Sequence, residues 1–392
     1  MYRIKCGFTL FFLSCWLCQI PGQCEKDLVL TSQAAIDDFS LNHATCDTIY
    51  GDLTIEGEDV VSLAALITIK AISGTLKINE CHGLISLAGL DNLSYLGGSL
   101  IIVLNTNLLS LQGLNQIRSI GDHLRIEGNR LLKGIHDLEN LEVIGKDLRL
   151  VLNDSLRDFS GLNKIKKIGW SIDLDKNFSL INFRGLDNLE EIGQNLYIYR
   201  QYALQDLKGL QNLSRIGGEM DIAENTVLSN LDALASLESI EDCLYIFGNE
   251  ALTSIDGLTS LATLGNTITV IRNPLLNQCN VFGLCDYLEN PPGSVSIWEN
   301  GELCSTIAGF TESCSVTGLV RESINIGLDM YPNPTSDYLN LTGRDGTFYN
   351  LLISGPSGHR LMIDTFYAKK MIDLSEFQPG LYFIQVDNGL GM

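Results

Sequence analysis

The amino-acid sequence predicts a mainly β fold, a parallel β-solenoid of leucine-rich-like repeats followed by a small antiparallel β-sandwich. Two observations lead to this expectation. A nine-residue phrase returns every 24 residues, and each copy is followed by a short apolar–polar alternation. After Cys314 this rhythm stops, and different turn and strand motifs take over. A fixed period of this length is the signature of a repeat architecture, in which each unit stacks on the next.

The repeated phrase is typified by Gly-Leu-Asp-Asn-Leu-Glu-Glu-Ile-Gly, which begins at Gly185. Regular copies begin at Gly89, Gly113, Asp137, Gly161, Gly185, Gly209, Ala233 and Gly257, and a degenerate copy begins at Ala65. The sequence therefore predicts nine turns of a solenoid.

A short strand is expected eleven residues after each phrase begins, where two apolar residues flank one other residue, as in Leu148 and Leu150. Alternation with a period of two predicts a strand that buries one face. The expected strands begin at Leu76, Leu100, Leu124, Leu148, Ile172, Leu196, Met220, Leu244 and Ile268. With one strand in each turn, these segments should form a parallel sheet.

An amide side chain recurs three residues beyond the second apolar position of each regular strand. These residues are Asn105, Asn129, Asn153, Asn177, Gln201, Asn225, Asn249 and Asn273. An inward amide can bond the backbone groups freed where the coil bends, and stacked copies can bond one another. The leucines three residues further on, from Leu108 to Leu276, should fill the core behind this ladder. We expect a structural role at all of these positions.

Residues 1–23 have the pattern of a signal peptide. Arg3 and Lys5 precede an apolar run from Phe8 to Leu17, which is too short for a membrane span, and Pro21 and Gly22 break it. A buried N-terminal helix is the alternative. Later stretches are not long and apolar enough to span a bilayer, so no transmembrane segment is expected after cleavage.

Export makes disulfides the favoured interpretation of the cysteines, because an oxidising compartment lets thiols pair. Cys24 and Cys46 flank the start of the repeats, and four cysteines follow their end: Cys279, Cys285, Cys304 and Cys314. Both groups lie where a solenoid needs caps, and their connectivity stays open. Zinc is the competing interpretation of the second group, but its gaps of six, nineteen and ten residues lack paired short spacings. Cys81 and Cys243 lie inside repeats and are expected to be small buried hydrophobic residues.

The region 24–316, with its L-x-I-x-x-N-x-x-L phrase, resembles the receptor L-domain branch of leucine-rich-repeat-like solenoids. The segment Cys46-Asp47-Thr48-Ile49-Tyr50-Gly51-Asp52-Leu53-Thr54-Ile55 resembles the first turn of that family. The resemblance implies the fold of a ligand-binding lobe, and it names no ligand.

Beyond a linker at 317–327, residues 328–392 alternate between turn motifs and apolar strands, which predicts the antiparallel sandwich. They contain Tyr-Pro-Asn-Pro-Thr from Tyr331, Gly-Pro-Ser-Gly from Gly355, and Pro-Gly-Leu-Tyr-Phe-Ile from Pro379. This wording resembles the C-terminal sorting domain of the type IX secretion system of Bacteroidota, and departs from it only in the last residues, Asn388 to Met392. The resemblance implies passage through the periplasm, contact with the type IX machinery, and secretion or display on the outer-membrane surface.

Charge and composition argue against several other functions. The chain has 47 acidic and 26 basic residues, a formal net charge of −21, so nucleic acid is an unsuitable partner. Its five histidines belong to no recognisable motif, and the sequence lacks H-E-x-x-H, G-x-S-x-G and a phosphate loop. We expect no enzyme, no cofactor and no metal site.

The outward side of the predicted sheet is the candidate surface for a protein or glycan ligand. The candidate binding residues are Arg125, Arg149, Asp173, Tyr197, Tyr199, Asp221, Tyr245 and Phe247. The tyrosine pair should stand two strands from Tyr245 and Phe247, which makes a shallow aromatic trough suited to sugars or protein hot spots. Alternatively, these aromatic residues simply favour strands. A structural surface spacer and a glycan-active enzyme are the competing functions.

Overall fold

A computed structural model describes residues 24, 26–279, 281–310, 329–331, 338–343, 348–354, 360–374 and 383–387. The chain divides into two compact units, Met1–Cys314 and Ser315–Met392. The expected signal peptide, the linker and Cys314 lie outside the described residues. Within the described part, no helix is long and apolar enough to cross a membrane.

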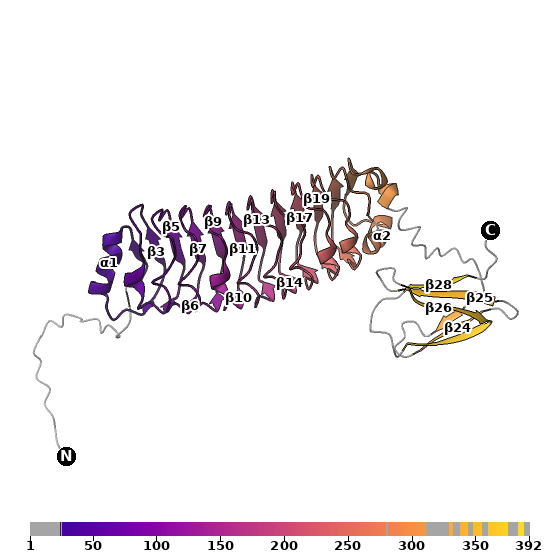
Figure 1. Cartoon of the computed structure of the whole chain (residues 1–392), viewed down its shortest axis with the longest axis horizontal. Coiled ribbons are helices and arrows are strands. Elements are labelled where there is room, and N and C mark those ends of the chain that lie inside the picture. Colours follow the sequence, from indigo (N-terminus) through magenta and orange to yellow (C-terminus); the bar gives the residue numbers. More distant parts are fainter. Residues whose placement is uncertain are drawn as a thin grey trace, which may run out of the picture. The chain divides into compact units, whose positions relative to one another are not determined.

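The first unit is a parallel β-solenoid, as the repeat predicts (Figure 1). One strand per coil enters a sheet that we call the long-strand sheet, which has twelve strands among the described residues. In spatial order they are β1 (Leu28–Leu30), β3 (Leu53–Glu56), β5 (Leu76–Asn79), β7 (Leu100–Val103), β9 (Leu124–Glu127), β11 (Leu148–Val151), β13 (Ile172–Asp175), β15 (Leu196–Tyr199), β17 (Met220–Ala223), β19 (Leu244–Phe247), β21 (Ile268–Ile271) and β22 (Val295–Trp298). All nine expected strands are present.

The expected number of nine turns is too low, because β1, β3 and β22 extend the sheet at both ends. Leu53 pairs with Leu28 on one side and with Leu76 on the other, and Val295 pairs with Ile268. These intervals differ from 24 residues. A search at a fixed period therefore passes over the first and last coils.

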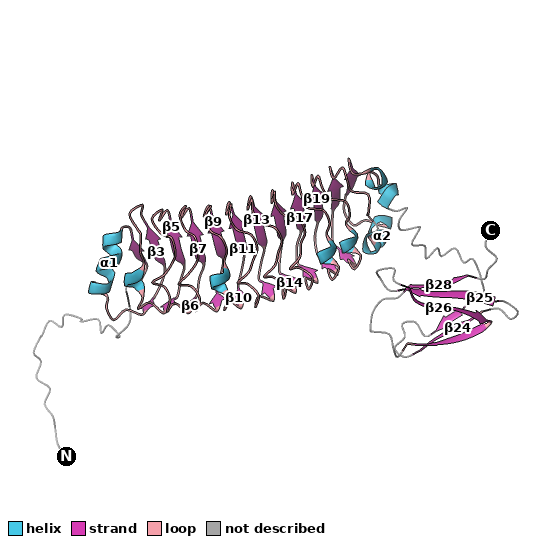
Figure 2. Ribbon diagram, viewed as in Figure 1, coloured by secondary structure: helices cyan, strands magenta, loops and turns pink. Residues whose placement is uncertain are grey.

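Among the described residues, a second sheet closes the other side of most coils, and the sequence pattern does not predict it (Figure 2). Its ten strands have two residues each: β2 (Thr48–Ile49), β4 (Ala71–Ile72), β6 (Tyr95–Leu96), β8 (Ser119–Ile120), β10 (Val143–Ile144), β12 (Lys167–Ile168), β14 (Glu191–Ile192), β16 (Arg215–Ile216), β18 (Ser239–Ile240) and β20 (Thr263–Leu264). Two residues are too few to show alternation. The second residue of each strand is buried, and it packs with the long-strand residues in one continuous core.

At the opening of the repeated phrase the chain makes one of two local turns. Five glycines there have φ between 106° and 117°, a region that favours glycine: Gly89, Gly113, Gly161, Gly185 and Gly209. The other coils form a short 3₁₀ helix at this place instead: η1 (Ala64–Leu66), η2 (His136–Leu138), η3 (Asp232–Leu234) and η4 (Asp256–Leu258). Three of these coils carry Ala65, Asp137 or Ala233 at the phrase opening, so the chain avoids positive φ there where a side chain is present. The fourth carries Gly257, so glycine permits the positive-φ turn without requiring it.

The amide ladder is confirmed, since all eight predicted amides are fully buried. Asn153 shows the pattern. Its Nδ2 donates to the carbonyl of Ile126 at 2.8 Å, its Oδ1 accepts from the backbone N–H of Asn129 at 3.3 Å, and its own N–H donates to Asn177. Asn300 ends the ladder beyond the regular repeats and accepts from both the backbone and the side chain of Asn273.

Gln201 is the exception in the ladder, and a substitution there is expected to improve it. Its Nε2 donates to the carbonyl of Tyr199 in its own coil, whereas the asparagines donate to the preceding strand. The substitution Gln201→Asn should let the amide reach that strand and raise the free energy of unfolding by about 0.5–1 kcal/mol. Urea unfolding measures the change, with Gln205→Asn on the exposed loop as the control. A lower stability for Gln201→Asn would contradict this interpretation.

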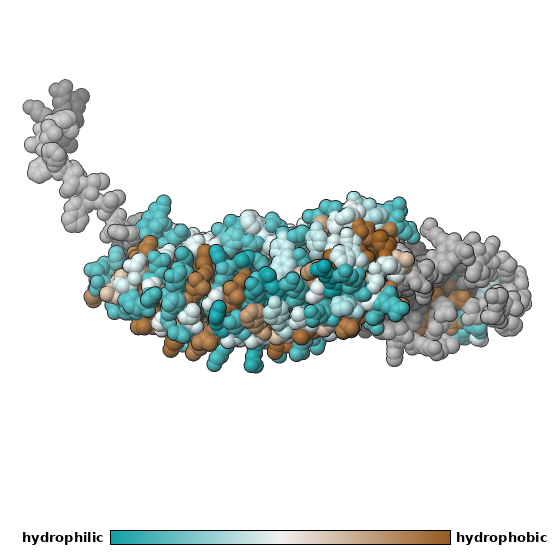
Figure 3. Space-filling view, turned by 90° about the horizontal axis from the view of Figure 1, so that it is seen from above, coloured by the Kyte–Doolittle hydropathy of each residue, from teal (hydrophilic) through white to brown (hydrophobic). Residues whose placement is uncertain are grey.

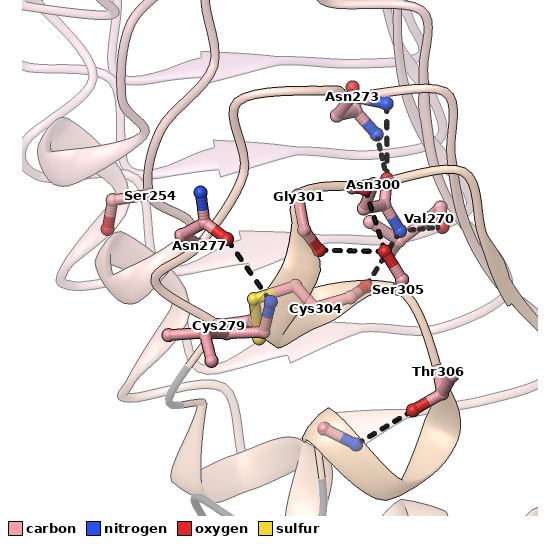
Figure 4. Close-up of a disulfide and its surroundings, with 12 residues drawn as sticks. Ser254, Val270, Asn273, Asn277, Cys279, Asn300, Gly301, Cys304, Ser305 and Thr306 are labelled. Carbon is pink, nitrogen blue, oxygen red and sulfur yellow. Dashed lines mark hydrogen bonds between the residues drawn. A yellow bond between two sulfur atoms is a disulfide. The ribbon is translucent and has the colours of Figure 1, made fainter.

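Disulfide-bearing caps cover both ends of the solenoid. Helix α1 (Gln33–Asn42) covers the first coil with Ile36 and Phe39 buried, and Cys24 is bonded to Cys46. Helix α2 (Phe282–Glu289) and η5 (Glu302–Cys304) lie in the other cap. There Cys279 is bonded to Cys304, below the end of the ladder (Figure 4).

These bonds favour disulfides over zinc in the C-terminal cap. Cys285 is also disulfide-bonded, and Cys314 lies outside the described residues. Cys81 and Cys243 are free thiols and are buried, as expected. Burial raises the pKa of the Cys81 thiol to about 12, so it stays protonated.

In the described residues of the second unit there are two antiparallel sheets of three strands each, which confirms the expected sandwich. One has the order β23 (Asp329–Tyr331), β24 (Tyr338–Thr342) and β27 (Lys369–Asp373); the other has β26 (Arg360–Tyr367), β25 (Phe348–Ser354) and β28 (Phe383–Asp387). Leu339 and Ile372 of the first sheet and Leu351 and Phe366 of the second belong to one buried cluster.

Candidate binding face of the long-strand sheet

The outward residues of the long-strand sheet lie in register from coil to coil. Tyr197 pairs with Asp221, which pairs in turn with Tyr245. In the parallel column, Ala223 lies between Tyr199 and Phe247. The aromatic residues of β15 and β19 therefore stand two strands apart, with an acidic and a small residue between them.

The middle of this face is an ion-pair network across strands. The guanidinium of Arg149 on β11 contacts Glu127 of β9 and Asp173 of β13, and Arg125 pairs with Glu127 at 2.6 Å. Burial of Glu127 opposes ionisation, but hydrogen bonds from both arginines outweigh it and lower the pKa of this carboxyl. The charges of three candidate binding residues, Arg125, Arg149 and Asp173, are therefore already paired with charges on neighbouring strands or on the same strand.

The tyrosines of β15 are held in place by hydroxyl hydrogen bonds. Tyr199 donates to Oδ2 of Asp221 at 2.8 Å, and Tyr197 donates to Oε1 of Glu219. Their ring centroids are 5.7 Å apart with an interplanar angle of 21°. Burial, followed by these bonds to carboxylates, raises the pKa of both hydroxyls, so they remain donors at any physiological pH. The two rings therefore form a fixed platform.

Tyr245 on β19 lies two residues from Cys243. Its hydrogen bond with the thiol of Cys243, followed by burial, raises the pKa of Tyr245 to about 12. Phe247, two residues on, stands 5.7 Å from the guanidinium of Arg272, and Arg272 lies at the same distance from the ring of Trp298. Aromatic rings thus recur on β15, β19 and β22, with other residues on the strands between them.

Asp221 lies between Tyr197 and Tyr245 on the outward face, with its charge only partly compensated. Its Oδ2 accepts the Tyr199 hydroxyl, whereas its buried Oδ1 has no hydrogen-bond partner. Burial raises the pKa of the Asp221 carboxyl above its ordinary value, and the neighbouring Glu219 adds to the shift. Burying a carboxylate without full compensation costs folding free energy.

Several residues of this region escaped the sequence analysis. Glu219 stands one residue before its strand, outside the alternating pattern. Phe178 and Tyr202 lie in the bends that follow β13 and β15 and stack at 5.5 Å with an interplanar angle of 3°. Trp298 belongs to the coil whose spacing departs from 24 residues. A search for outward aromatic residues in every coil, including the bends, would have found the last three.

One group in the described part of the chain could hold a metal ion, which the sequence analysis did not expect. Glu219, Asp242 and Cys243 each offer one ligand atom, and these atoms lie within 4.8 Å of one another. Acidic oxygens would suit Ca²⁺ or Mg²⁺, whereas the thiol suits softer metals. The three donors, two carboxylate oxygens and one thiol, therefore favour no single metal ion.

Comparison with known families now connects the fold to a function. Residues 45–132 match the model described as Receptor L domain, and residues 329–391 match the model described as Secretion system C-terminal sorting domain. No curated protein matches the chain. The chain is a receptor L-domain-like solenoid with a type IX sorting tail. It is exported to the cell surface or secreted.

Export and the disulfides of the L-domain-like solenoid are chemically consistent, because thiol pairs persist in an oxidising compartment. The family match begins at Thr45 and ends at Leu132, so it covers the first regular coils. The aromatic coils from β15 onward lie outside the matched residues. The family match therefore carries no information about a ligand at the coils from β15 to β22, which we call the aromatic end.

Proposed function

We propose that the exported solenoid recognises a protein or glycan ligand at the cell surface through the outward face of its long-strand sheet, and that it acts by binding without catalysis. The fixed platform of Tyr197 and Tyr199 on β15, together with the aromatic residues of β19 two strands away, is the observation that carries this proposal. Ordered, partly exposed tyrosines lose little conformational entropy on binding and supply large contact areas. Such residues dominate the energy of many interfaces.

The surface properties of the solenoid support a localised site. Figure 3 shows hydrophobic residues on one face in separate patches among hydrophilic ones. Isolated apolar side chains are ordinary on soluble proteins, whereas a group of aromatic rings within three successive coils favours a partner. The ion-pair network around Arg149 would instead keep the middle of the face rigid.

A binding array with the full-length protein tests the proposal. The substitutions Tyr197→Ser and Tyr245→Ser together should weaken binding to a glycan or surface-protein ligand at least about tenfold, because two aromatic anchors are lost. The melting temperature should change little. The matched control replaces Tyr50 and Tyr95, two exposed tyrosines of the first coils, by Ser.

Three results would contradict the proposal in different ways. Lower stability with unchanged binding would mean that the tyrosines serve the sheet alone. Failure of the unsubstituted protein to bind any arrayed ligand would favour a structural spacer. If the protein hydrolysed a glycan on the array and the Glu219→Gln variant did not, the result would favour a glycan-active enzyme, since paired carboxylates carry out that reaction.

A further inference from the structure

The acidic residues of the long-strand face fall into two groups with different partners. In the middle coils, Glu127 and Asp173 are paired with Arg149, and Asp175 accepts two hydrogen bonds from Arg200 at 2.8 and 2.9 Å. At the aromatic end, the structure shows no cationic partner for Glu219, Asp221 or Asp242 among the described residues; their contacts there come from neutral hydroxyl, thiol and amide groups. The second group is therefore an uncompensated negative patch, which we call the acidic-aromatic patch together with Tyr197, Tyr199 and Tyr245.

The geometry gives this patch two properties that suit a cation. The carboxylates come from adjacent coils and lie beside tyrosine rings whose positions are fixed by hydrogen bonds. A Lys or Arg side chain placed over such rings gains from the ring quadrupole and from the neighbouring carboxylates together. A neutral sugar would gain only the stacking and neutral hydrogen bonds.

The same sheet already contains an internal example of this mode. Arg272 lies 5.7 Å from the rings of both Phe247 and Trp298, and its Nε donates to Glu299 at 3.1 Å. Two aromatic rings and one carboxylate thus hold a guanidinium at the end of the sheet. The acidic-aromatic patch offers the same two kinds of group, aromatic rings and carboxylates, without the arginine.

Building on the proposed recognition function, we propose that the acidic-aromatic patch binds a basic segment of a protein partner. Lys or Arg side chains of that segment stack on Tyr197, Tyr199 or Tyr245 and pair with Glu219 and Asp242, while the partly buried Asp221 adds negative charge between the rings. The net charge of −21 also favours encounter with a basic partner, most strongly at low salt.

A peptide-binding measurement on the full-length protein tests this assignment. The probes are fluorescein-labelled twelve-residue peptides with alternating Lys and Ser, alternating Gln and Ser, or alternating Glu and Ser. Fluorescence anisotropy is recorded at several salt concentrations in EDTA, which removes any metal-bridged contact. The Lys peptide should bind, its affinity should fall with salt, and the other two peptides should not bind.

Two triple variants with the same change in net charge separate a defined site from general attraction. The patch variant carries Glu219→Gln, Asp221→Asn and Asp242→Asn. The control variant carries Asp38→Asn, Glu58→Gln and Glu238→Gln, all at exposed positions away from the patch. The patch variant should lose at least about tenfold in affinity for the Lys peptide and show a shallower salt dependence, whereas the control variant should bind as the unsubstituted protein does. Equal losses in both variants would overturn the proposal.

The single substitution Asp221→Asn should change stability and peptide binding in opposite directions, which a purely structural residue would not do. Because the Asp221 charge is incompletely compensated, its removal should raise the melting temperature while it weakens peptide binding. A lower melting temperature would overturn the assignment of Asp221 to the patch.

The two levels of the proposal fail in distinguishable ways. Suppose that a neutral glycan on the array binds the unsubstituted protein and the patch variant but does not bind the Tyr197→Ser and Tyr245→Ser variant. That result would overturn the proposal of a basic protein partner and leave the proposed recognition function standing. Absence of any ligand for the unsubstituted protein would overturn both.

Discussion

Replacing Asn153 by Ala is expected to lower the free energy of unfolding by about 2–5 kcal/mol, because it leaves two buried backbone groups without partners. The Asn153 side chain is fully buried and serves the carbonyl of Ile126 and the N–H of Asn129. Each unpaired buried group costs about 1–3 kcal/mol, and no solvent reaches this part of the core to replace the lost bonds. Urea unfolding measures the change.

Asn212→Ala is the matched control for this substitution. Asn212 is exposed and makes one side-chain bond, from Nδ2 to the carbonyl of Asp187 at 2.7 Å. Water can satisfy that carbonyl after the substitution, so the loss should stay below about 1 kcal/mol. Similar losses at the two positions would show that the ladder contributes no more than an ordinary surface bond, contrary to our interpretation.

The sequence was sufficient for the parts of the fold that repeat with constant spacing. Four-residue strands such as Leu148–Val151 alternate visibly, and the buried amides recur at one position per coil, so both could be assigned. The two-residue strands, such as Lys167–Ile168, carry no alternation of their own and exist only because neighbouring coils stack. Strand β22 was missed because a 27-residue step separates Val295 from Ile268.

The binding face was predictable in position but not in its interactions. Alternation is enough to show that Tyr197 and Arg149 face outward. Which groups they meet depends on side chains that reach to neighbouring coils, 22 or 24 residues away in sequence. The arginines that looked available for a ligand proved to be paired within the sheet. The three carboxylates of the acidic-aromatic patch have no cationic partner in the part of the chain that the structure describes, and two of them, Glu219 and Asp242, stand outside the strand pattern.

Removing the disulfide of the C-terminal cap should also lower the free energy of unfolding by several kcal/mol. The bond between Cys279 and Cys304 closes a loop with a sequence separation of 25 residues. Loop-closure entropy alone gives about 3–4 kcal/mol for a loop of this size. The double substitution Cys279→Ser and Cys304→Ser should therefore lower the free energy of unfolding by about that amount, as measured by denaturant unfolding without reductant.

The region that loses protection shows whether the disulfide stabilises the cap alone or the whole solenoid. A solenoid coil contacts only its neighbours, so loss of the end cover should first expose the last coils. There Asn300 holds Asn273 through two bonds and donates to the carbonyls of Val270 and Cys304 (Figure 4). Hydrogen exchange should therefore accelerate in β21 and β22 and leave β3 and β5 protected.

The corresponding double substitution at Cys24 and Cys46 is the matched control, because it removes the N-terminal disulfide and leaves the other end intact. It should give the opposite pattern of hydrogen exchange, with faster exchange in β1 and β3. Uniform acceleration along all coils in both variants would contradict the cap interpretation, because it would mean that the solenoid opens as one cooperative unit. The acidic-aromatic patch lies only one coil from β21, so opening of the C-terminal cap should also weaken ligand binding there, whereas opening of the N-terminal cap should not.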